Sequence, residues 1–142
     1  MLELKTTITA QKNNLQELQR LLETELHLIS SRDAEALISL LSTKEALLAT
    51  IQEQDLVISK IYNNATQELK DDNDITSLFN DAKELVSQCK FRTQINQTAV
   101  EQGQLRLEHL RSLLIESRAK ESMTYDKSGK TRGGSATGGI SA

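Results

Sequence analysis

Apolar residues recur at every seventh position through the first part of the chain. Ile8, Leu15, Leu22 and Ile29 stand seven apart, and further leucines widen this spacing into a stripe. A repeat of this length is typical of α-helices that pack along one another, because seven residues complete almost two helical turns. The chain of 142 residues also contains no proline, a residue that interrupts helices. The sequence therefore predicts long helices packed side by side.

The composition favours an all-α fold. Leucine and other good helix formers are abundant, whereas tryptophan is absent and only 3% of the residues are aromatic. Sheet-rich folds draw more of their core from β-branched and aromatic side chains. A chain of this length has room for one hydrophobic core, so we expect a single helical domain.

Two polar clusters divide the repeat into three helical segments. The first is the Ser-Ser-Arg-Asp run at residues 30–33, and the second is the acidic run at residues 71–74. Such residues favour turns and helix N-caps, so we expect further helices over residues 33–70 and 75–122. Short turns join antiparallel neighbours. This order predicts an elongated antiparallel helical hairpin or three-helix coiled-coil bundle.

The last predicted helix has a polar middle and a leucine-rich end. Gly103 stands in the polar stretch, and glycine in a helix interior costs about 1 kcal/mol relative to alanine. We therefore expect the helix to kink, fray or divide there. Leucine density rises again from Leu105 to Ile115. This face has two interpretations, as part of the bundle core or as an exposed stripe that accepts a partner helix.

Small and polar residues fill the C-terminal end of the chain. Five of the six glycines follow residue 128, and so little apolar surface cannot offset the entropy lost on ordering. We predict a helical domain over residues 1–122 and a flexible Gly/Ser-rich tail over residues 123–142. Tyr125, just beyond the expected end of the helix, has no core to enter, and tyrosine is a favoured interface anchor.

Few residues offer reactive chemistry. Cys89 is the single cysteine, and its place on the apolar stripe favours a buried thiol over a nucleophile. His27 and His109 are too far apart in sequence to suggest a metal site. Lys44 occupies a nominal core position, where we expect its stem to lie along apolar surface with its charge in water. The sequence thus indicates no catalytic residue, no cofactor and no metal, and it does not indicate an enzyme.

The charge and hydropathy of the chain limit the kinds of partner that we expect it to bind. The formal net charge is −3, whereas phosphate binding requires clustered lysine and arginine, so we expect no nucleic-acid partner. No apolar run approaches the roughly 20 residues that span a bilayer, so we expect no stable membrane insertion. No secretory signal is visible at the start of the sequence. We expect a cytoplasmic protein.

Four stretches of the chain resemble the FlgN family, the cytoplasmic export chaperones for the hook–filament junction proteins of bacterial flagella. They are the opening leucine helix, the turn and helix start at residues 32–48, the polar stretch around Asn96, and residues 124–131. The last stretch is the most specific, because it carries Tyr125 and Gly129 in a Tyr-x-x-x-Gly pattern after the last helix. Together the four stretches cover nearly the whole chain.

The resemblance implies a non-enzymatic chaperone. Such proteins bind the C-terminal helical regions of hook-associated proteins, prevent their premature polymerisation and keep them ready for export. The family is thought to bind its clients with the C-terminal part of the last helix. Carried onto this sequence, that site comprises Leu105, Leu107, Leu110, Leu113 and Leu114. The family's tyrosine that helps the loaded chaperone dock on the cytoplasmic domain of the export gate corresponds to Tyr125.

Two alternatives remain open at this point. The same heptads are compatible with a structural coiled-coil protein that self-assembles, and a chaperone of another secretion system differs in its client more than in its physics. The sequence also leaves a monomer and a homodimer open. The mass of the protein in solution discriminates the self-assembling alternative.

Overall fold

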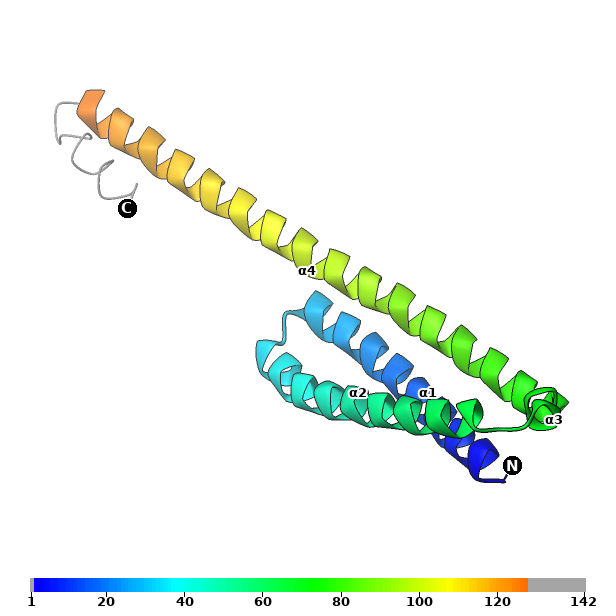
Figure 1. Cartoon of the computed structure of the whole chain (residues 1–142). Coiled ribbons are helices and arrows are strands. Elements are labelled where there is room, and N and C mark those ends of the chain that lie inside the picture. Colours follow the sequence, from blue (N-terminus) through cyan, green and yellow to red (C-terminus); the bar gives the residue numbers. More distant parts are fainter. Residues whose placement is uncertain (1, 128–142) are drawn as a thin grey trace. The chain divides into compact units, whose positions relative to one another are not determined.

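The computed structural model of the chain describes residues 2–127, and side chains through residue 123. The helices are α1 (Leu2–Ser31), α2 (Ala34–Asn63), α3 (Gln67–Lys70) and α4 (Asn73–Lys127), as Figure 1 shows. Residues 2–127 contain no strand, and the predicted all-α class is confirmed. The predicted tail beyond residue 127 lies outside the described residues.

The chain divides into two compact units, Met1–Ala99 and Val100–Ala142. The first unit contains α1, α2, α3 and the part of α4 that ends at residue 99. The second unit contains the rest of α4. A domain boundary at residue 122 stays a prediction.

The turn between α1 and α2 lies where the polar run at residues 30–33 predicted it. Arg32 adopts a left-handed backbone with a φ of 59°. The Asp33 carboxylate then caps α2 by accepting a hydrogen bond from the backbone N–H of Ala36 at 3.1 Å. This arrangement occupies a backbone donor that the first turn of a helix otherwise leaves unpaired.

The second predicted segment is two helices instead of one. α2 ends at Asn63, seven residues before the expected end, and a short connection leads to α3. Asn63 and Asn64 fit this end because asparagine side chains compete for backbone hydrogen bonds and disfavour helix interiors. The Thr66 hydroxyl then starts α3 by accepting a hydrogen bond from the backbone N–H of Leu69 at 3.4 Å.

α4 is longer and more continuous than predicted. The Asp72 carboxylate caps its start, two residues before the expected one. The helix stays regular through Gly103, so the predicted fraying or division there is wrong. The neighbouring glutamines, leucines and arginines are good helix formers and offset the cost of one glycine. The helix also passes the expected end at Ser122 and reaches Lys127, which is 55 residues in all.

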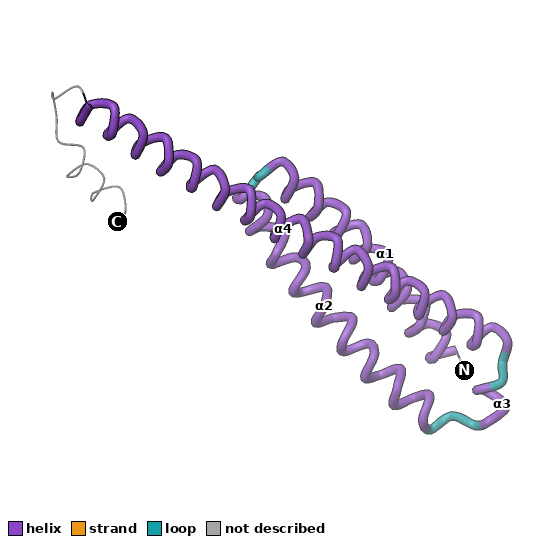
Figure 2. Tube along the Cα trace, turned by 90° about the horizontal axis from the view of Figure 1, so that it is seen from above, coloured by secondary structure: helices purple, strands orange, loops and turns teal. Residues whose placement is uncertain are grey.

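α1 and the first part of α4 run parallel in a constant register, with α2 antiparallel to both (Figures 1 and 2). Three side-chain pairs repeat at seven-residue intervals on both helices. They are Lys5 with Asp74 at 3.1 Å, Lys12 with Asp81 at 3.0 Å, and Gln19 with Gln88 at 3.0 Å. Such a repeat is the geometry of coiled-coil packing, so the predicted heptad pattern is confirmed for this pair of helices.

Two clusters of buried residues form the core of the first unit. One joins all three long helices through Leu4, Ile8, Ile58 and Ile75. The other consists of Leu18, Leu22 and Cys89, with Leu47 and Ile51 packed against it. The apolar stripe predicted for α1 therefore lies in the core.

α2 buries its apolar side chains only in part. Leu41 and Leu48 are 48% and 44% exposed. Each of them follows another leucine, Leu40 or Leu47, and successive helical residues point about 100° apart. Leu47 packs against the cluster of Leu18, Leu22 and Cys89, and the adjacent Leu48 stays exposed.

A polar layer joins the three long helices within the first unit. The buried Asn96 amide on α4 donates hydrogen bonds to the carbonyl of Leu22 at 2.9 Å and to the Glu25 carboxylate on α1 at 2.7 Å. The other oxygen of Glu25 accepts from Lys44 Nζ on α2 at 2.7 Å. Lys44 thus pairs its charge with a carboxylate, and its side chain stays 21% exposed. A polar group at a core position fixes the register of packed helices.

Candidate functional site

The single thiol and the two histidines are not arranged for catalysis. Cys89 is buried, and its thiol donates to the carbonyl oxygen of Leu15 at 3.6 Å. Burial raises the pKa of the Cys89 thiol and keeps it in the neutral form, which is a poor nucleophile. His27 and His109 are exposed on α1 and α4. Across the described residues, His, Cys, Asp and Glu form no group of three that could hold a metal ion.

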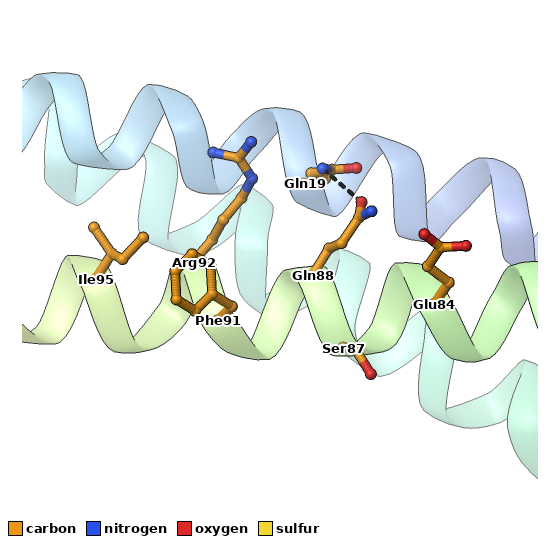
Figure 3. A pocket seen from close by; sticks show the side chains of 7 residues that line it. All are labelled: Gln19, Glu84, Ser87, Gln88, Phe91, Arg92 and Ile95. Atoms are coloured by element: carbon orange, nitrogen blue, oxygen red, sulfur yellow. Dashed lines mark hydrogen bonds between the residues drawn. The ribbon is translucent and has the colours of Figure 1, made fainter.

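A shallow hollow of about 500 Å³ lies between α1 and α4 in the first unit (Figure 3). The Gln19 amide donates to Gln88 across it at 3.0 Å, and Arg92 reaches Glu23 on α1 at 2.9 Å. Phe91 at its rim is 64% exposed. These contacts hold the two helices together, and most of the residues that line the hollow are polar or charged.

The part of α4 that belongs to the second unit carries exposed leucines. Val100, Gly103, Leu107, Leu110 and Leu114 follow one another at intervals of three and four residues, which places them on one side of α4. We call this set the α4 stripe. The side chains of Leu107, Leu110 and Leu114 are 61%, 52% and 54% exposed. The leucines of the α4 stripe are therefore exposed within the second unit.

The five leucines predicted as a site do not all share this side of the helix. Leu113 lies next to the α4 stripe, three residues after Leu110. Leu105 stands two residues before Leu107 and nine before Leu114, which is about 160° and 180° around the helix from them. α4 thus brings four of the five leucines together and presents Leu105 on its opposite side.

The chain matches the family described as FlgN protein over residues 1–133. This match covers nearly the whole sequence. The chain belongs to the FlgN family. No curated protein and no solved structure matches it significantly. The resemblance found in the sequence is confirmed, and FlgN membership implies the role of a flagellar export chaperone.

Membership of the FlgN family implies binding of flagellar substrate proteins. None of the helices in the described part of the chain combines the length and apolarity needed to cross a membrane. Tyr125 lies in the last turn of α4 and not beyond the helix. Its side chain is outside the described residues.

Sequence reasoning missed exposed apolar side chains in the first unit of this FlgN chain. On α2, Ile38 and Leu56 are exposed together with Leu41 and Leu48, and on α4 Phe91 is exposed. The leucine pairs at residues 40–41 and 47–48 carried an ambiguous signal, because adjacent helical residues point about 100° apart and yet Leu21 and Leu22 on α1 are both buried. Phe91 carried no such signal, since its neighbours are polar on both sides.

Proposed function

We propose that this protein binds the C-terminal helical regions of hook-associated proteins on the α4 stripe together with Leu113. Binding covers the apolar surface through which the clients polymerise, and the complex then carries them to the export gate. The proposed role places the protein in the cytoplasm. The observation that carries the proposal is the exposure of Leu107, Leu110, Leu113 and Leu114 on one side of a regular helix. FlgN membership supports it.

The energetics suit a chaperone that must release its client. Full burial of a leucine side chain contributes about 2 kcal/mol, so a few leucines supply a useful binding energy. Association offsets much of this gain, because two partners lose translational freedom and their side chains become ordered. The result is moderate affinity, which leaves the client free to leave at the export gate.

Calorimetric titration with C-terminal segments of hook-associated proteins tests the client site. We expect saturable one-to-one binding to the unmodified chain. The double variant Leu110→Asp/Leu113→Asp should lose it, because carboxylates at these positions cannot enter an apolar interface without a large desolvation cost. Leu105→Asp is the matched control, since it places the same charge on the opposite side of the helix. Equal affinity of all three proteins would overturn the assignment of the face.

We further propose that Tyr125 docks the loaded chaperone on the cytoplasmic domain of the export gate. The proposal rests on the matching position of the tyrosine in the family and on its place in the last turn of α4. Tyr125→Ala should weaken binding of the client complex to that domain in a pull-down and leave client affinity unchanged. Loss of client binding instead would mean that the two roles are misplaced.

A further inference from the structure

The α4 stripe has the spacing of a coiled-coil seam. Val100, Leu107 and Leu114 stand seven apart, and Gly103 and Leu110 stand three residues after the first two of them. In heptad terms these are a and d positions, which face a partner helix, and the flanking e and g positions meet the flanks of that partner. The charge at those flanking positions therefore selects the partner.

Arginines flank the α4 stripe, and carboxylates avoid its edges. Arg106 stands at a g position, and Arg111 and Arg118 stand at e positions. Glu108 and Glu116 fall at outer positions of the same heptads. All five side chains are exposed. None of the ion pairs among the described residues involves these three arginines.

The first unit shows what the same arrangement does inside this protein. Lys5 and Lys12 flank the seam of α1 and meet Asp74 and Asp81 at the edge of α4, at 3.1 and 3.0 Å. Basic residues on one helix thus pair with acidic residues on its parallel neighbour at heptad intervals. In the second unit the basic half of such a ladder is present without an acidic half.

A second copy of the chain fits this face poorly. In a parallel pair the g position of one helix meets the next e position of the other, so Arg106 would lie against Arg111 of the second copy. In an antiparallel pair e meets e and g meets g, and no carboxylate stands at these positions between residues 104 and 120, so no favourable ion pair forms there either. Like charges at these positions oppose pairing.

We infer that the α4 stripe selects an amphipathic helix from a different chain, one whose apolar seam is flanked by aspartate or glutamate. This inference rests on the proposed function and names the chemistry that the client must carry. The leucines supply the contact area. The arginines at positions 106, 111 and 118 supply the choice of partner, and they keep the chain from pairing with itself through this face.

Two synthetic helical peptides test the inference. Both carry leucine at every a and d position over four heptads, and they differ only at e and g, which are glutamate in one and lysine in the other. Uniform flanking charge also keeps each peptide from self-association. Calorimetric titration of the full chain at low salt should give at least about tenfold tighter binding of the glutamate peptide, because several favourable pairs replace repulsive ones. The preference should shrink at high salt.

Charge reversal on the protein provides the matched variants. Arg106→Glu/Arg111→Glu should invert the preference between the peptides, and Glu108→Lys/Glu116→Lys, at outer positions, should leave it unchanged. Circular dichroism checks that both variants stay helical. Equal binding of the two peptides, a preference that survives Arg106→Glu/Arg111→Glu, or a homodimer that Leu110→Asp dissociates would overturn the inference. Failure of both peptides would also overturn it, and the hook-associated segments then show whether the proposed function falls with it.

Discussion

Arg32 occupies a position that usually suits glycine. Its φ of 59° lies in the left-handed region, which costs a side-chain-bearing residue about 1 kcal/mol or more. Its N–H and that of Asp33 bond to the carbonyls of Ile29 and Leu28 at 3.2 and 3.1 Å, and so close the end of α1. This pattern is the Schellman motif, in which glycine is the commonest residue at the left-handed position.

Arg32→Gly should therefore stabilise the protein. We expect the free energy of unfolding to rise by about 0.5–1 kcal/mol, because glycine adopts this backbone without strain. Urea denaturation followed by circular dichroism measures the change. Ser30→Gly is the control, since it places the same residue inside the last helical turn and should lower stability by about 0.5–1 kcal/mol. A loss of similar size in both variants would contradict the role given to residue 32.

The Glu25–Lys44 pair should contribute more than the ion pairs at the edges of the bundle. Its partners are mostly buried, and Glu25 also accepts from Asn96. A double-mutant cycle to alanine should give a coupling above about 1 kcal/mol for Glu25 and Lys44. The more exposed pair of Lys12 and Asp81 should give less than about 1 kcal/mol in the same measurement. Equal coupling energies in the two cycles would mean that the Glu25–Lys44 pair contributes no more to stability than the exposed pair does.

At the scale of the elements, the heptad spacing and the helix-capping residues predicted the helices better than helix propensity did. The heptad of Ile8, Leu15 and Leu22 predicted α1, and the serine and aspartate run predicted the turn before α2, the helix that Asp33 caps. The break at Asn63 was missed because apolar residues continue on both sides of it, so periodicity gave no warning. At Gly103 the sequence predicted a break that the structure does not have. A local cost of about 1 kcal/mol cannot divide a helix when the residues around the glycine favour the helix.

The candidate site was predictable in part. Leucine density marked the second unit, but density does not say which leucines share a side of α4. That requires the angular position of each residue around the helix, which places Leu105 on a different side from Leu107, Leu110 and Leu114. Whether a stripe is covered depends on the tertiary packing of the other helices, and the sequence alone left that open.

Gly103→Ala tests the continuity of α4. A Cβ at this position would meet no other atom within 4 Å, so alanine fits without any rearrangement. Alanine in place of an exposed helical glycine should stabilise the helix by about 0.5–1 kcal/mol. We expect greater helicity by circular dichroism and slower amide exchange at residues 99–107. Unchanged exchange would show that this stretch is not helical in solution.

At the scale of the whole molecule, the two compact units differ in the interactions that stabilise them. The first has a buried core, a heptad ladder of ion pairs and a polar layer that ties three helices together. The second has a helix whose leucines lie exposed between arginines. The proposed function gives this contrast a purpose: it assigns stability to the first part and client binding to the second.

Hydrogen exchange read by mass spectrometry, with and without the C-terminal segment of a hook-associated protein, tests this account most directly. In the free chain the amides of residues 100–117 should exchange much faster than those of the buried core, since few packed side chains protect them. Saturation with the segment should slow residues 100–117 by at least about tenfold and leave residues 1–99 unchanged. Protection confined to the exposed face of α2 or to the hollow beside Phe91, with residues 100–117 unaffected, would contradict it.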